Sequence, residues 1–81
     1  MPATEQTFQQ IRSLIAQICD IPAETIQKEG RLIGYKMDSI RALDLIVAIE
    51  DAFHLTLDKD EMYEVKTVAE LCDYVQKHLP A

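Results

Sequence analysis

Apolar residues recur at intervals of three and four positions in three separate stretches of this chain. The first stretch predicts an amphipathic helix over residues 5–19, the second a helix over 39–53 and the third a helix over 68–79. Acids at 58–61 predict a short helix that runs to about residue 65, because negative charge stabilises the start of a helix. The pattern therefore predicts an all-α fold, a small four-helix bundle of three longer helices and one short one.

Residues 20–37 form a long connection between the first two predicted helices. Loops of this length are unusual in small domains and often serve a function. We expect the connection to pack down through four apolar anchors, which are Ile21, Ile26, Leu32 and Ile33. The run 54–57 alternates briefly as a strand does, but it has no partner strand and is predicted to be a loop.

Polar residues mark where each helix begins. The first helix could start from Thr4 or Thr7, and the second could be capped by Asp38 or by Ser39. The start of the predicted helix over 68–79 is less ambiguous, because Thr67 and the glutamate three residues later form a capping box. The spacing also predicts the buried face of the second helix, formed by Leu43, Ile46, Ile49 or Glu50, and Phe53.

A second stripe on the same helix alternates apolar and acidic residues and is too polar for a core. It consists of Ile40, Asp44, Val47 and Asp51, with Glu50 beside it. One interpretation is a solvated face. The other is a docking surface, on which acids steer a basic partner and the apolar residues supply contact on arrival.

Length and charge restrict the possible functions. The chain has 81 residues, so we expect one domain over residues 1–81 and no room for a large catalytic cleft. Its 48% of hydrophobic residues is typical of a folded globular chain. Acids outnumber bases by 14 to 8, for a net charge of −6, and the excess lies in the second half. Nucleic-acid binding is disfavoured, and a basic partner is the natural complement.

No membrane span or signal peptide is predicted, because no apolar stretch approaches the roughly 18 residues that a span requires. We therefore expect a cytoplasmic protein that binds no membrane. Cys19 and Cys72 each fall near an apolar periodic position, which predicts buried free thiols in a reducing compartment. Neither belongs to a Cys or His cluster that would bind zinc.

The sequence contains no convincing catalytic or metal-binding constellation. A nucleophilic Ser39 would need a nearby base, but His54 lies at the far end of the predicted helix, roughly 22 Å away at 1.5 Å per residue. His78 is near the C-terminus, and no glycines flank the serine as in a nucleophile elbow. The acids at 58–61 lack the glycine and the bidentate glutamate that a calcium loop requires.

Residues 34–43, which read Gly-Tyr-Lys-Met-Asp-Ser-Ile-Arg-Ala-Leu, put an Asp-Ser-Ile triplet where the long connection meets the second helix. This triplet and the order of elements around it resemble the acyl carrier and peptidyl carrier protein family. The matching order is an N-terminal helix, a long loop, the triplet, a helix ending near residue 53, a short acidic segment and a Thr-Val start to the last helix. The resemblance covers nearly the whole chain.

The resemblance implies that Ser39 bears a covalent 4′-phosphopantetheine arm and that Asp38 is the acid beside it. A separate phosphopantetheinyl transferase, with magnesium and coenzyme A, would attach the arm, so the chain itself would not be an enzyme. The positive end of the helix dipole would favour the resulting phosphodiester. The competing interpretation is that the serine is only an N-cap. In this family the second helix is the main recognition element, which implies partner docking at Ile40, Arg41, Asp44, Val47, Glu50 and Asp51.

Two residues depart from the family pattern. Lys36 stands two positions before the aspartate, where many members have glycine, and Arg41 replaces an acid that is common in fatty-acid carriers. Both put positive charge beside the serine, which argues against the primary fatty-acid machinery. Peptidyl carriers often have two glycines before the triplet, and this chain does not.

We therefore expect a discrete, monomeric acyl carrier of a polyketide or specialised fatty-acid pathway. Its partners would be the transferase and acyl-loading, ketosynthase or other biosynthetic enzymes with basic docking surfaces. The acyl chain would shelter among Leu43, Ile46, Phe53, Leu71 and Val75. The rivals are a peptidyl or aminoacyl carrier, including a D-alanyl carrier, and a helical adaptor without a prosthetic group. The sequence does not distinguish between cargoes or pathways, nor between a free-standing domain and one excised from a megasynthase.

Overall fold

The computed structural model describes residues 4–79. Three long helices dominate it, α1 (Glu5–Cys19), α2 (Ser39–Phe53) and α4 (Val68–His78), and a short helix, α3 (Lys59–Met62), precedes the last one. The predicted all-α bundle of three longer helices and one short one is confirmed. No helix within the described residues is long and apolar enough to span a bilayer.

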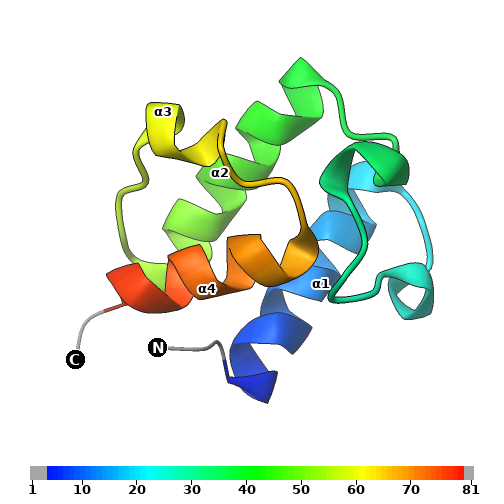
Figure 1. Cartoon of the computed structure of the whole chain (residues 1–81), viewed down its shortest axis with the longest axis horizontal. Coiled ribbons are helices and arrows are strands. Elements are labelled where there is room, and N and C mark those ends of the chain that lie inside the picture. The colour runs from blue at the N-terminus through cyan, green and yellow to red at the C-terminus, as the bar shows by residue number, and fades with distance from the viewer. Residues whose placement is uncertain (1–3, 80–81) are drawn as a thin grey trace.

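The core lies where α1 packs against both α2 and α4 (Figure 1). Its buried apolar side chains come from all three long helices and from two loops, and they are Phe8, Ile11, Ile15, Cys19, Ile26, Leu45, Ile46, Ile49, Leu57, Val68, Leu71, Cys72 and Val75. The two cysteines are buried free thiols, as predicted. Burial, with a smaller contribution from Asp73, raises the pKa of Cys72 to about 11.

Helix α1 has the predicted bounds, and Thr4 rather than Thr7 begins it. The Thr4 hydroxyl accepts a hydrogen bond from the backbone N–H of Thr7 at 3.1 Å, as an N-cap does. Thr7 itself is buried, and its hydroxyl donates to Gln76 Oε1 at 2.7 Å. The two threonines therefore have different roles, because one starts α1 and the other ties α1 to α4.

The connection between α1 and α2 contains two 3-10 turns, η1 (Ala23–Thr25) and η2 (Leu32–Tyr35). Ile26 is fully buried, as expected of an anchor, whereas Ile33 is 78% exposed. The prediction for Ile33 is therefore wrong. Within the 3-10 turn, Leu32 packs against the core and its neighbour faces the other way.

Close contacts hold this connection in place. The Tyr35 hydroxyl accepts the Gln27 N–H at 3.0 Å, and its ring lies so close to Gly30 that any β-carbon there would clash. The connection also bonds to the start of α4, where the Val68 N–H donates to the Gly30 carbonyl at 3.0 Å. These contacts fix the connection internally and to the start of α4.

Helix α2 has the predicted bounds but a different buried face. Leu45, Ile46 and Ile49 are buried, whereas Leu43, predicted to face the core, is 47% exposed. The reason is angular. At 100° per residue, Leu43 lies about 120° around the helix from Ile49, while Ile46 and Leu45 lie about 60° and 40° from it. The prediction from i+3 spacing alone therefore placed Leu43 in the core, where the structure places Leu45.

The residues after α2 form a loop, as predicted, but α3 is shorter than expected. It ends at Met62 instead of reaching Val65, because the Val65 N–H bonds back to the Met62 carbonyl in a tight turn. Asp58 caps α3 by accepting two backbone N–H groups, and the Tyr74 hydroxyl of α4 donates to Glu61 at 3.0 Å. The short helix is therefore stabilised by the Asp58 cap at its start and by the bond between Glu61 and α4.

The last helix begins at the predicted capping residue. The Thr67 hydroxyl accepts the Glu70 N–H at 3.1 Å and lies 3.1 Å from the Glu70 carboxylate. Helix α4 ends at His78, one residue earlier than predicted, and Leu79 has an extended backbone. The predicted stop at Pro80 lies outside the described residues.

Candidate functional site

Ser39 is the first residue of α2, and it is exposed. The cap of this helix is the preceding residue, because Asp38 Oδ1 accepts the Arg41 N–H at 2.8 Å. Of residues 4–79, none forms a hydrogen bond with the Ser39 hydroxyl. This resolves the two possible starts of α2, since the aspartate stabilises the helix and the serine hydroxyl remains available for reaction.

The position of Ser39 also suits a phosphodiester. Backbone N–H groups at the first turn of a helix have no partners within the helix, and the helix dipole places partial positive charge there. An anion bonded to the Ser39 oxygen would lie at this positive end. An exposed hydroxyl at the start of a fifteen-residue helix therefore fits a covalently attached phosphopantetheine group.

Both histidines lie at the C-terminal ends of helices. His54 follows the last residue of α2, at the opposite end from Ser39, and it adopts the left-handed conformation that ends the helix. His78 is the last residue of α4, where its Nδ1 is 2.9 Å from the Tyr74 carbonyl and its ring contacts the Tyr74 ring edge to face. Each histidine has a role at a helix end, and neither forms a hydrogen bond with Ser39 within the described part of the chain.

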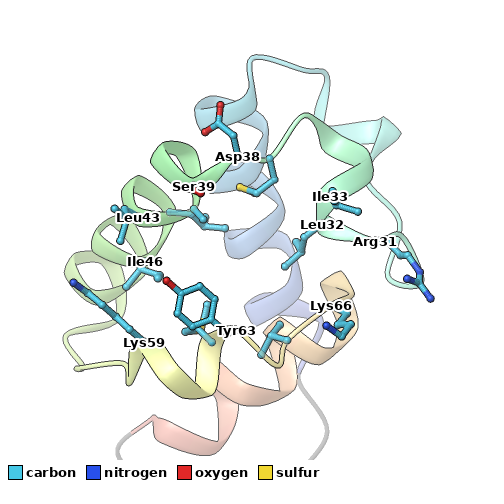
Figure 2. A pocket seen from close by; sticks show the side chains of 15 residues that line it. Arg31, Leu32, Ile33, Asp38, Ser39, Leu43, Ile46, Lys59, Tyr63 and Lys66 are labelled. Atoms are coloured by element: carbon cyan, nitrogen blue, oxygen red, sulfur yellow. The ribbon is translucent and has the colours of Figure 1, made fainter.

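A cavity of about 540 Å³ opens beside Ser39, between α2, η2 and α3. Apolar side chains form most of its wall. Figure 2 shows Leu32 from η2, Ile46 from α2 and Tyr63, which directly follows α3, converging on it. Three basic residues lie at its edge, Arg31, Lys59 and Lys66. A cavity of this size and polarity can shelter an apolar chain of moderate length.

Of the five residues predicted to shelter an acyl chain, two line this cavity. Leu43 and Ile46 line the cavity, whereas Leu71 and Val75 are fully buried in the core and Phe53 packs against the core instead. The wall also includes residues that the sequence did not indicate, which are Leu32, Met37, Ala42, Leu45, Met62, Tyr63 and Val65. Met37, Ala42 and Leu45 are close in sequence to Asp38, Leu43 and Ile46, whereas Leu32, Met62, Tyr63 and Val65 come from segments distant in sequence and had no local signal.

The six predicted docking residues on α2 divide into two groups. Ile40, Asp44, Val47 and Asp51 are exposed, with Ile40 73% and Val47 57% accessible. The other two residues bond within the chain. Glu50 Oε2 accepts the Leu57 N–H at 2.9 Å, and Arg41 Nη1 donates to the Lys36 carbonyl at 2.9 Å. The structure therefore leaves a narrower exposed stripe than the sequence suggested.

Comparisons with known proteins agree with this geometry. Residues 9–75 match the family described as a phosphopantetheine attachment site. The chain is 40% identical over 73 residues to acyl carrier protein 3 of Ralstonia nicotianae, an alignment that covers 86% of this chain and 82% of the relative. It is also 27% identical over 70 residues to a non-reducing polyketide synthase of Preussia isomera, covering 86% of this chain but only 3% of that much longer protein.

A solved structure gives the same result. A free-standing peptidyl carrier protein from a secondary metabolic pathway of Acinetobacter baumannii superposes with a TM-score of 0.76 at 28% identity, covering 86% of this chain and 88% of the other. Family match, relatives and fold agree, so the chain belongs to the phosphopantetheine-binding carrier proteins, which hold the arm covalently and are not themselves catalytic.

Proposed function

We propose that this chain is an acyl carrier, that it forms a single carrier domain over residues 1–81, and that Ser39 holds its 4′-phosphopantetheine arm. The observation that carries the assignment of the serine is the division of roles at the start of α2. Asp38 provides the cap, while the adjacent Ser39 is exposed with a hydroxyl that no described residue engages. The chain has only one other serine, Ser13, which lies within α1.

The cargo we propose is an acyl intermediate of polyketide or specialised fatty-acid biosynthesis. Two findings support this choice. The relative with 40% identity is an acyl carrier protein, and a segment of a polyketide synthase is also similar. The mainly apolar cavity beside Ser39 suits a hydrocarbon chain better than a charged aminoacyl group, because transfer of a charge into an apolar environment is costly.

Carrier proteins of this family interact with synthase and biosynthetic enzymes. For this chain we propose docking through the exposed stripe of Ile40, Asp44, Val47 and Asp51, with a phosphopantetheinyl transferase and with acyl-loading or ketosynthase enzymes. The acids would steer a basic partner surface, and the two apolar residues would be buried on contact. Glu50 and Arg41 bond within the chain, so their contribution to docking would be smaller.

A peptidyl or aminoacyl carrier is the second candidate. The similarity to a free-standing peptidyl carrier protein supports it, because that match covers 86% of this chain. Mass spectrometry of the protein purified from its native host distinguishes the two candidates. An acyl thioester on the arm supports the first candidate, and an aminoacyl thioester would replace it with the second.

The attachment site is tested by incubating the purified chain with coenzyme A and a phosphopantetheinyl transferase of broad specificity. Intact mass measurement is expected to detect the gain of one arm in the natural chain and in a Ser13→Ala control. Ser39→Ala is expected to abolish the gain completely. Retention of the gain in Ser39→Ala would place the arm elsewhere, and circular dichroism of each variant confirms that the helices are intact.

A further inference from the structure

The backbone three residues before Ser39 adopts a conformation that its side chain disfavours. Lys36 has φ 63° and ψ 25°, in the left-handed helical region, where the β-carbon of a residue other than glycine crowds the backbone. Asp20 and His54 also adopt this region, but each ends a long helix and donates its N–H to the last turn. Lys36 follows only the four-residue turn η2.

Arg41 holds this segment on both sides of Met37. Its guanidinium Nη1 donates to the Lys36 carbonyl at 2.9 Å, and its backbone N–H donates to Asp38 Oδ1 at 2.8 Å. One residue of the first turn of α2 therefore fixes the two residues that flank Met37. Met37 is itself partly buried and lines the cavity, so the same two bonds also set one wall of it.

We infer that Arg41 is a positioning residue for the attachment serine. Its guanidinium stabilises the left-handed Lys36, which fixes the backbone through Asp38 and orients the Ser39 hydroxyl for transfer of the arm. A glycine at position 36 would adopt this conformation without such help. The pair Lys36 and Arg41 thus forms a clasp, and the positive charge of Arg41 is secondary to the bond that it makes. This inference rests on the proposed attachment of the arm to Ser39.

The clasp predicts a specific coupling between the two positions. We would measure kcat and KM of a phosphopantetheinyl transferase for the chain as its protein substrate, in four forms: natural, Arg41→Met, Lys36→Gly and the double variant. Arg41→Met is expected to lower kcat by about fivefold, because it removes a charge-assisted bond next to the reacting residue. In the Lys36→Gly background the same change is expected to cost less than about twofold.

A docking role for the Arg41 charge predicts a different result. Loss of that charge would raise KM by the same factor in both backgrounds, and this outcome would overturn the clasp. An unchanged kcat in Arg41→Met would overturn it too. The matched control is Lys77→Met, which removes one positive charge from the exposed last turn of α4 and is expected to leave kcat unchanged. An equal loss of kcat in this control would assign the effect to net charge.

Hydrogen exchange tests the clasp without any transferase. Arg41→Met is expected to speed amide exchange around residues 36–38, and Lys36→Gly is expected to restore slower exchange in the double variant. Unchanged exchange in Arg41→Met would contradict the clasp even if Ser39 carries the arm. Should Arg41→Met fail to fold while the double variant folds, the coupling is shown directly. The arm appearing on a residue other than Ser39 would instead overturn the proposed function.

Discussion

The two sides of this small bundle use their apolar residues differently. The core side is formed by α1, α4 and the buried face of α2 around Ile49. There Ile11, Ile15, Leu71 and Val75 are fully buried, and a hydrogen bond from Thr7 links α1 to α4. The serine side is formed by residues 31–47 and 59–66. Within residues 4–79, it holds all five large apolar side chains that stay exposed, Ile33, Ile40, Leu43, Val47 and Tyr63. One side supplies stability, and the other leaves apolar surface exposed, as the proposed cargo and partners would require.

Two substitutions on α2 test this contrast most strongly. Ile49 faces the core with no exposed surface, and Leu43 faces the cavity. Ile49→Ala is expected to lower the free energy of unfolding by about 2–5 kcal/mol, because it leaves a void in a packed core. Leu43→Ala is expected to cost less than about 1 kcal/mol. Urea unfolding followed by circular dichroism measures both, and equal losses would remove the distinction between the sides.

A second prediction concerns the pH dependence of the core side. Burial raises the pKa of Cys72 from 9.0 to about 11, so above pH 9 the unfolded thiol loses its proton before the folded one does. The unfolded state then binds fewer protons, and stability, fully present below pH 9, falls as the pH rises towards 11.

The measurement is the urea midpoint at several pH values between 8 and 11. The natural chain is expected to lose stability more steeply than Cys72→Ala, which lacks the thiol but keeps the other groups that titrate at high pH. Parallel slopes in the two proteins would show that Cys72 makes no contribution to the loss. The comparison of slopes is independent of the stability that the alanine itself costs.

The smallest expected effect on the fold comes from the exposed acids of the serine side. Asp44→Lys and Asp51→Lys are expected to leave unfolding nearly unchanged and to slow loading by the transferase a few-fold, because the acids steer a basic partner. The slowing is expected to be larger at low salt, where screening is weaker. Glu29→Lys, in the connection, is a control of equal charge change. A similar slowing in this control, or none in either aspartate variant, would contradict docking through α2.

The sequence predicted the features that depend on local periodicity and capping. The bounds of α1 and α2, the Thr67 start of α4 and the place of Ser39 at a helix start all follow from residues close together in the chain. The cavity did not follow, because its wall combines residues near Leu32 with residues near Tyr63. Their meeting depends on how the loop before α2 packs beside α3, which periodicity does not encode.

Two further errors have a common physical cause. Ile33 was expected to be an anchor and Leu43 a core residue, and both are exposed beside the cavity. Hydrophobicity alone indicates burial, but apolar residues that serve the proposed cargo and partners would stay exposed in the chain by itself. The left-handed backbone at Lys36 was equally hidden, since lysine gives no sequence signal for that conformation.

The capping of α2 by Asp38 has a consequence for the order of events in the life of this protein. Because Asp38 and not the serine hydroxyl caps the helix, the proposed esterification of Ser39 would break no hydrogen bond within residues 4–79. We therefore expect the unmodified chain to be folded. The proposed transferase would then act on a folded substrate and would not have to modify the chain before α2 forms.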